Sequence, residues 1–391
     1  QRQMCIRDSN NATTQLDPAV LEAMLPFLKD HFANPSSAYS AAKPVRKAVN
    51  LAREQAAAFL DCDPDEIIFT SGGTEADNAA ILSARRLYPE KNHFVTCAAE
   101  HDAITNCLKS LQSTDGIEIT SLSTRPDGTI DLDELRHAIR PGRTAMVTLM
   151  MANNETGVIQ PVTAASEIAE SSGALFHTDA VQAAAKIPIR LRNSSIHSLA
   201  LSGHKFHAPK GIGILYINRR TAFHPLLTGG SQENQRRAGT ENPAAIAALG
   251  TACQLGLQHL DSLTSNPDPV AALRDHFEQQ ITSLIEGVTI NGSSAPRTPN
   301  TSNLRISGTE AAAMTLLLDQ KGVCISAGSA CHSGSHHISP VLAAMGLSPS
   351  EARQSLRVSF SRFSTLTETN TAITHFISAT TRIRSLLTST P

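Results

Sequence analysis

The sequence contains no apolar stretch approaching the roughly 20 residues that a transmembrane helix needs. It has no run of lysine or arginine, and its 33 basic and 35 acidic side chains leave a formal net charge of −2. We therefore expect neither a membrane partner nor a nucleic-acid partner. Internal repeats and low-complexity segments are also missing.

A disulfide framework is not indicated either. The seven cysteines are scattered and odd in number, which suits a reducing compartment, and we expect a cytoplasmic protein. Cys331 lies close to His332, His336 and His337. Because this spacing matches no standard zinc pattern, we expect no metal site there. The roles of the three histidines stay open.

The chain has 391 residues, of which 41% are hydrophobic and 17% are charged, as in ordinary globular proteins. This length favours two domains over one. Residues 1–9 (QRQMCIRDS) show neither periodicity nor a helix start signal, and they resemble a translated sequencing adapter. We interpret them as a non-native scar and exclude them from the fold; a short native strand is the alternative.

Strand and helix patterns alternate through the first part of the chain. The alternation predicts an α/β fold with a mostly parallel sheet flanked by helices, whose active groups lie beyond the carboxyl ends of the strands. Expected strands are 66–70, 93–97, 117–122, 145–151, 174–178, 199–202 and 212–217. A polar loop at 264–269 precedes a second α+β unit with helices at 270–285 and 310–318 and strands at 303–306 and 356–360. We predict a large domain at 15–255 and a small domain that consists of 256–391 together with residues 10–14.

Lys205 is the most informative single residue. It follows an apolar run in Ser202-Gly203-His204-Lys205, where an amine can be held rigidly and partly desolvated. Such an amine suits Schiff-base chemistry. Asp179 ends another apolar run, and a buried acid there needs a cationic partner. A protonated ring nitrogen of a cofactor meets that need, and so does an arginine.

Other candidates are weaker alone. Gly72-Gly73-Thr74 before a helix is either a phosphate cradle or a simple turn. His101 is either a ring-stacking proton carrier or a surface residue. Asn153-Asn154 either donates to a phenolate oxygen or forms a turn. Arg357, on a strand, either grips a carboxylate or lies on the surface.

Two loops complete the set of candidates. The Gly-rich loop 229–240 either is a flexible surface loop or contacts a second subunit. Cys331 lies in the small-residue loop Gly328-Ser329-Ala330-Cys331, which can present one thiolate. Cys97, Cys107, Cys253 and Cys324 are expected to be buried, small apolar residues.

The order of these motifs carries more information than any one of them. SGGTEADN, EH, NNETGV, HTDAVQ, SGHK, RRAGT and SAGSACHSG together resemble the cysteine desulfurases of the class-V aminotransferase family, which use pyridoxal 5'-phosphate (PLP). The resemblance covers about 10–363, and the GSAC loop is similar to that of the iron–sulfur-cluster branch. It implies PLP-dependent transferase fold type I, with a seven-stranded sheet in the large domain.

The resemblance also implies an activity. L-Cysteine would become L-alanine, and its sulfur would pass to Cys331 as a persulfide. Partners would be a second copy of the chain in a homodimer and a sulfur-acceptor protein such as an iron–sulfur scaffold.

The resemblance further assigns roles to individual residues. Lys205 would bind PLP covalently and carry the α-proton, Asp179 would pair with the ring nitrogen, and His101 would stack on the ring and assist proton transfer. Arg357 would grip the substrate carboxylate beside the turn that contains Asn11. The remaining cofactor contacts would come from Asn154 and Gln182 at the phenolic oxygen, Gly73, Thr74, Ser202 and His204 at the phosphate, and Thr240 at the cofactor of the partner subunit.

The sequence departs from the family pattern at two places, before the turn at 10–14 and after the loop that contains Cys331. Ser9 stands where the family usually has an aspartate, and His337-Ile338 stands where many relatives have Glu-Pro. A selenocysteine lyase or a plain class-V aminotransferase is the related alternative, and the GSAC cysteine argues against the aminotransferase. An idle sulfur-carrier or metal-binding scaffold is the unrelated alternative, and the Lys205–Asp179 pair argues against it.

Overall fold

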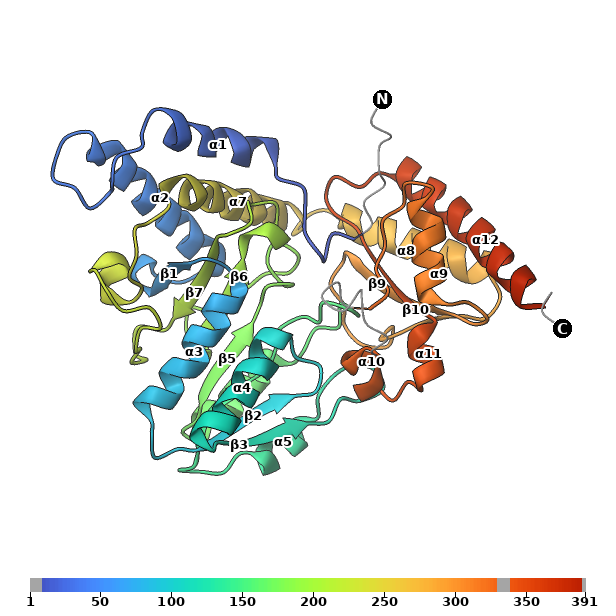
Figure 1. Cartoon of the computed structure of the whole chain (residues 1–391), viewed down its shortest axis with the longest axis horizontal. Helices are drawn as coiled ribbons and strands as arrows, with labels where there is room; N and C mark the ends of the chain where they lie inside the picture. The colour runs from blue at the N-terminus through green and yellow to red at the C-terminus, as the bar shows by residue number, and fades with distance from the viewer. Residues whose placement is uncertain (1–8, 329–337, 389–391) are drawn as a thin grey trace.

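The computed structural model describes residues 9–328 and 338–388, which form two sheets, each with its own helices (Figure 1). The larger sheet has seven strands in the order β1-β7-β6-β5-β4-β2-β3. Its strands are β1 Ile67–Thr70, β2 His93–Cys97, β3 Glu118–Leu122, β4 Thr144–Thr148, β5 Leu175–Asp179, β6 Ser198–Ser202 and β7 Gly213–Ile217. Strand β7 runs antiparallel to both of its neighbours, and the other pairings are parallel.

Helices cover both faces of this sheet, which explains why its central strands are buried along nearly their whole length. One face packs against α3 Gly73–Leu87 and α4 Asp102–Asp115. The helices that contribute to the core of the other face are α1 Pro18–Lys29, α2 Ala42–Leu60, α5 Leu132–Ala138, α6 Val162–Ser171 and α7 Pro243–Ser262.

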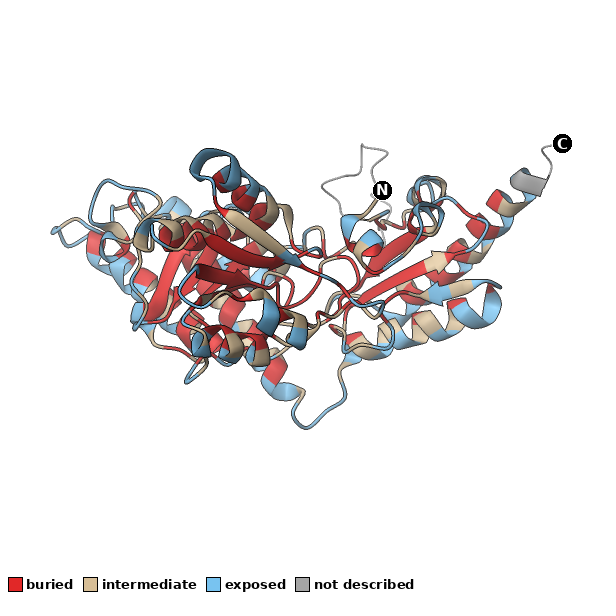
Figure 2. Ribbon diagram, turned by 90° about the horizontal axis from the view of Figure 1, so that it is seen from below, coloured by how far each residue is buried: buried red, intermediate tan, exposed pale blue. Residues whose placement is uncertain are grey.

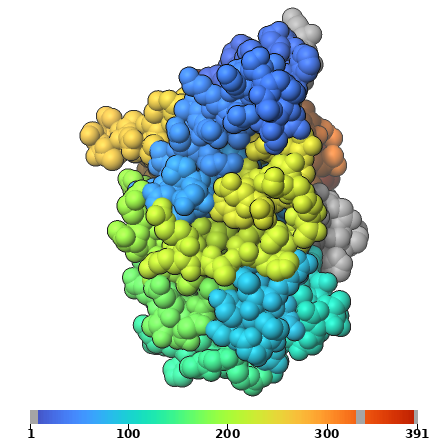
Figure 3. Space-filling view, turned by 90° about the vertical axis from the view of Figure 1, so that its left-hand side faces the viewer, coloured from blue at the N-terminus to red at the C-terminus, as the bar shows by residue number. Residues whose placement is uncertain are grey.

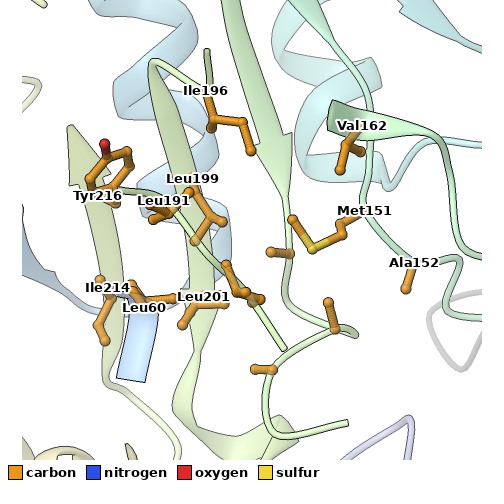
Figure 4. Close-up of a cluster of buried hydrophobic side chains, with 14 of the residues drawn as sticks. Leu60, Met151, Ala152, Val162, Leu191, Ile196, Leu199, Leu201, Ile214 and Tyr216 are labelled. Carbon is orange, nitrogen blue, oxygen red and sulfur yellow. The ribbon is translucent and has the colours of Figure 1, made fainter. Parts of the chain in front are cut away.

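The core of that second face is built from large apolar side chains of adjacent strands and of the helices that cover them. Leu199 and Leu201 of β6 lie beside Ile214 and Tyr216 of β7, and Leu60 of α2 packs against them (Figure 4). All five residues are at most 1% exposed. This packing holds the carboxyl ends of β5 and β6, where the site lies, in fixed positions.

The smaller sheet is antiparallel, in the order β10-β9-β8. Its core is separate and includes Phe277, whose ring meets those of Phe360 and Phe376 edge-on at centroid distances of 5.8 and 5.3 Å. Figure 2 shows the two buried regions side by side. The elements of this unit are β8 Val288–Ile290, β9 Thr301–Ile306, β10 Ser355–Ser359, α8 Pro269–Leu284, α9 Ala311–Asp319, α10 Pro340–Ala344, α11 Pro349–Arg353 and α12 Leu366–Thr388.

The N-terminal turn belongs with the smaller sheet. Ser9 forms a parallel bridge with Ser359 of β10, and the amide of Asn10 donates to the Ser359 carbonyl at 3.2 Å. Val341 and Leu342 of α10, in contrast, join the core of the larger sheet. The two cores therefore do not divide strictly by position in the chain, and the predicted boundary at 255/256 stays a prediction.

Most element boundaries agree with the sequence patterns to within a few residues, and three features differ. Strand β4 ends at Thr148 and not at Met151, and beyond it the Met150 amide donates to the Glu100 side chain at 2.7 Å, while Leu149 and Met151 still donate to carbonyls of β5. Strand β8 and the short helices α10 and α11 have no counterpart in the prediction. Within 9–328 and 338–388, no helix combines the length and the apolar character needed to cross a membrane.

Candidate active site

A cleft of about 850 Å³ lies beyond the carboxyl ends of β5 and β6, at the N-terminus of α3. Arg357 of the smaller sheet also lines it. Among the residues that the structure describes, it brings together all the predicted site residues except Thr240. The lining residues are Asn11, Ala12, Gly73, Thr74, Asp77, His101, Met150, Asn154, Asp179, Val181, Gln182, Ser202, His204, Lys205 and Arg357.

Lys205 enters the cleft from a 3₁₀ turn, η2 Gly203–Lys205, that directly follows β6. A Cβ at Gly203 would lie 2.9 Å from the Ala208 methyl, so the turn needs glycine to pack this closely. The Lys205 amine donates to the carbonyls of Asn11 and Ala12 at 2.7 and 2.9 Å. The turn at the N-terminus therefore holds the amine in place.

The α3 end of the cleft has the features of an anion site. The first backbone N–H groups of the 15-residue helix have no partner within the helix, and the hydroxyl of Thr74 lies beside them. A Cβ on Gly73 would come within 2.8 Å of Val181 Cγ2, so only glycine fits there. Burial and the charge of Lys205 lower the pKa of His204 to about 4, which makes this imidazole a neutral hydrogen-bonding group at pH 7.

Asp179 ends β5 and is 5% exposed. Its Oδ1 accepts the Val181 amide at 2.9 Å. Burial raises the pKa of this carboxyl, and the neighbouring His101 and Lys205 act in the opposite direction. A cation placed in the cleft would favour the ionised carboxylate further.

The position and tautomer of His101 are fixed by helix capping. His101 is the N-cap of α4, and its Nδ1 accepts the Ala103 amide at 3.1 Å. This hydrogen bond assigns the proton of the neutral ring to Nε2. The ring lines the cleft, so this nitrogen is the atom available for proton transfer.

Two buried acids near Asp179 were given no role from the sequence. Oδ1 of Asp77, on α3, lies 3.1 Å from Nε2 of His177. Burial and the charge of Asp179 raise the pKa of Asp77 well above its usual value, and burial lowers that of His177 to about 3. Both directions favour the neutral forms of the two side chains.

Glu100 is the second of these acids. Its Oε1 accepts the Met150 amide at 2.7 Å, and burial together with the charge of Asp179 raises its pKa to about 8. Burial thus raises the pKa values of Asp77, Glu100 and Asp179 together, and of the three only Asp179 has His101 and Lys205 acting against that shift. Sequence reasoning quoted both acids within motifs, but the burial that raises their pKa values is a property of the fold.

The small-domain wall of the cleft is formed by Arg357, which is 1% exposed. One of its guanidinium nitrogens, Nη1, donates to the Asn154 carbonyl at 2.9 Å. The side chain of Asn11 is held by Asn154, Thr301 and Asn300. Asn11 thus faces the cleft mainly through its carbonyl, which binds Lys205 and Gln182.

Cys331, with His332, His336 and His337, lies outside the described residues. On the near side of that segment, Ser326 exchanges two backbone hydrogen bonds with Arg357. On the far side, the Ser339 hydroxyl donates to Glu155 Oε2 at 2.6 Å. Both flanks are therefore attached to residues at or next to the cleft. Sequence reasoning did not assign this anchoring role to Glu155.

Thr240 is exposed and lies outside the cleft. Two ion pairs attach its loop to the large domain: Glu233 with Arg53 at 2.7 Å and Arg237 with Glu75 at 2.9 Å. The part of the chain that the structure describes contains no group of three His, Cys, Asp or Glu side chains that could hold a metal ion.

Known proteins are similar to this chain in both sequence and fold. The family model described as aminotransferase class-V matches residues 8–371. The chain belongs to this family. A relative named cysteine desulfurase, from Nostoc sp. strain PCC 7120, is 45% identical over 96% of the chain and 93% of its own length.

Solved structures with a similar fold carry related descriptions. A "NifS-like protein" superposes with a TM-score of 0.86 at 30% identity, covering 98% of this chain and all of its own. A structure described as "SspA in complex with cysteine" superposes with a TM-score of 0.79 at 34% identity, covering 90% of this chain and 98% of its own. The predicted family and fold class are confirmed.

Proposed function

We propose that this chain is a PLP-dependent cysteine desulfurase that converts L-cysteine to L-alanine and collects the sulfur on Cys331. The observation that carries the proposal is the cleft itself. It unites Lys205, the buried Asp179, the His101 ring and the guanidinium of Arg357, in a chain 45% identical to a protein named cysteine desulfurase.

The cleft residues fit PLP. The phosphate would lie at the N-terminus of α3. Glycine is needed at position 73 there, because a Cβ would lie 2.8 Å from Val181 Cγ2. The buried Asp179 would pair with the protonated ring nitrogen, whose positive charge would favour the ionised carboxylate. Once bound, PLP supplies an electron sink for the negative charge that develops at the α-carbon of the substrate. The remaining proposed contacts are those of Thr74, Ser202 and His204 with the phosphate, Asn154 and Gln182 with the phenolic oxygen, His101 with the ring face, Lys205 with the aldehyde carbon, and Thr240 from the partner subunit.

Substrate binding and proton transfer are carried out by different residues of the chain. Arg357 binds the substrate carboxylate and orients its Cα–H bond. The Lys205 amine moves the α-proton, and the carbonyls of Asn11 and Ala12, within 2.9 Å, hold the protonated amine between transfers. His101 Nε2 is placed to donate a proton near the ring.

Sulfur transfer requires a thiolate. The Cys331 thiolate attacks the sulfur of the substrate, forming an S–S bond while the Cβ–S bond breaks. The bond electrons stay with the carbon fragment, which takes up a proton and leaves as L-alanine. Cys331 retains the sulfur as a persulfide, and a second protein, such as an iron–sulfur scaffold, must remove it before the next turnover.

The exposed apolar surface supports the proposed homodimer. Phe32 is 84% exposed, and Leu28, Tyr39 and Leu51 are at least half exposed. Figure 3 shows the segment that contains them beside the loop that carries Thr240. A second copy covering this face would bury the apolar side chains and bring Thr240 to the cofactor of its partner.

Incubation with PLP and L-cysteine tests the proposal, with alanine and the Cys331 persulfide measured together. Equal amounts of both in a single turnover are the expected result. A colourless protein that takes up no PLP would contradict the proposal. Faster turnover of selenocysteine than of cysteine would instead favour the selenocysteine lyase alternative.

Replacing Arg357 by lysine is expected to raise the KM for L-cysteine by about ten- to a hundredfold. Lysine keeps the charge but loses the two-pronged contact, and a hydrogen bond to a charged group contributes about 1.5–3 kcal/mol. Steady-state kinetics measure the change. Arg353→Lys, at a position about half exposed on α11, is the matched control, and an equal KM increase in both variants would contradict the assignment.

A further inference from the structure

Lys186 lies behind the cleft and takes no part in the chemistry described so far. It lines a second cavity, of about 460 Å³, which shares Lys205 with the cleft. The Lys186 side chain is half buried and points back along its own turn toward Gln182. Lys186 therefore contacts Gln182, which lines the cleft, from the side of the second cavity.

The hydrogen bonds around Gln182 fix the orientation of its amide. Lys186 Nζ donates to Gln182 Oε1 at 2.8 Å. On the other side, Gln182 Nε2 donates to the Asn11 carbonyl at 3.0 Å, the same carbonyl that accepts from Lys205. The Asn11 carbonyl can only accept, so it requires the amide nitrogen on its side. The Lys186 ammonium can only donate, so it requires the amide oxygen on the other side, and the two contacts select one orientation of the amide.

The backbone before Lys186 adopts a conformation that favours this contact. Ala185 has a φ of 56°, in the left-handed region that costs a non-glycine residue about 1–2 kcal/mol. A Cβ on Gly256 of α7 would lie 3.0 Å from the Ala185 methyl. The glycine thus leaves room for the methyl group, and the strained residue turns the chain so that Lys186 returns to Gln182.

The electrostatic setting of Lys186 is consistent with a hydrogen-bonding role. Burial lowers its pKa to about 7, and the charges of Lys205 and Arg357 act in the same direction. Near neutral pH this amine is therefore partly uncharged. The ammonium form can only donate, so in this form Lys186 selects the orientation that turns the Gln182 oxygen toward it.

We propose that Lys186 is a positioning residue that keeps the Gln182 amide nitrogen turned toward the phenolic oxygen of the cofactor. The inference rests on the proposed function, in which Gln182 contacts that oxygen. With the reversed amide, an oxygen would face the phenolate and repel it. Lys186 acts through Gln182 and does not touch the reacting atoms.

A double-mutant cycle tests the proposal with PLP as the probe. Lys186→Met removes the donor and keeps the length of the side chain. We expect it to weaken PLP binding by about fivefold, as for one ordinary hydrogen bond, and to raise the pH midpoint of the visible absorption of bound PLP. In the Gln182→Ala background, the same substitution should change neither quantity.

Two control variants separate orientation from charge. Lys186→Arg keeps a donor and should restore both readouts toward wild type, whereas Lys109→Met, at an exposed site on α4, should leave them unchanged. Equal effects of Lys186→Met with and without Gln182 would overturn the inference, because they would show an action through charge on the cavity. A wild-type protein that binds no PLP would contradict the proposed function, and this inference with it.

Discussion

Replacing Lys205 by alanine is expected to lower the rate of alanine formation by at least a thousandfold. The substitution removes both the covalent attachment of the cofactor and the proton carrier, and proton transfer by a placed group alone contributes about 10²–10⁴-fold. It also removes the donor to the Asn11 and Ala12 carbonyls. PLP should still enter the cleft, since its phosphate and ring contacts do not involve the amine.

Borohydride reduction followed by peptide mass analysis measures the attachment. In the wild-type protein, the cofactor mass should remain on a peptide that contains Lys205, and in the variant on no peptide. Lys210→Ala is the matched control, because Lys210 is exposed and only five positions away. Cofactor fixed to another lysine with full turnover would rule out the assignment.

The arrangement of the large sheet could be predicted because its signals are local. Strands β2 and β6 are short apolar runs between turn residues, and helix patterns separate the parallel strands. The carboxyl ends of parallel strands meet at one edge, so Asp179 and Lys205 were expected to face the same cleft. The cleft contains both.

Features that depend on three-dimensional packing could not be predicted in this way. Strand β8 has three residues at the edge of its sheet, too few to show a period. The raised pKa of Asp77 follows from its burial, where it contacts His177, 100 positions away in the chain. The contact between Lys186 and Gln182 depends on the left-handed conformation of Ala185, which the sequence pattern gives no reason to expect.

The predicted burial of the cysteines was right for three of them and wrong for one. Cys97, Cys107 and Cys253 were expected to be buried, and they are. The expectation for Cys324 was wrong, because this residue is only partly buried. It lies between Val323 and Ile325, whose side chains are the ones that join the core of the smaller sheet.

Replacing Cys331 by alanine is expected to abolish persulfide formation while the protein keeps bound, coloured PLP. Among residues 9–328 and 338–388, four cysteines are buried, and burial raises the pKa of each thiol, which disfavours the thiolate needed for attack. These four are Cys62, Cys97, Cys107 and Cys253. They cannot substitute for Cys331 near neutral pH.

Mass spectrometry after a single turnover with L-cysteine measures the sulfur added to the protein. The wild type should gain one sulfur atom on Cys331, and the Cys331→Ala variant should gain none. Cys324→Ser is the sharpest control, because Cys324 is partly exposed and precedes Cys331 by only seven positions. If Cys324→Ser rather than Cys331→Ala lost the persulfide, the nucleophile would be Cys324. The cleft around Lys205 would then serve the same reaction with a thiol that approaches from the β10 side.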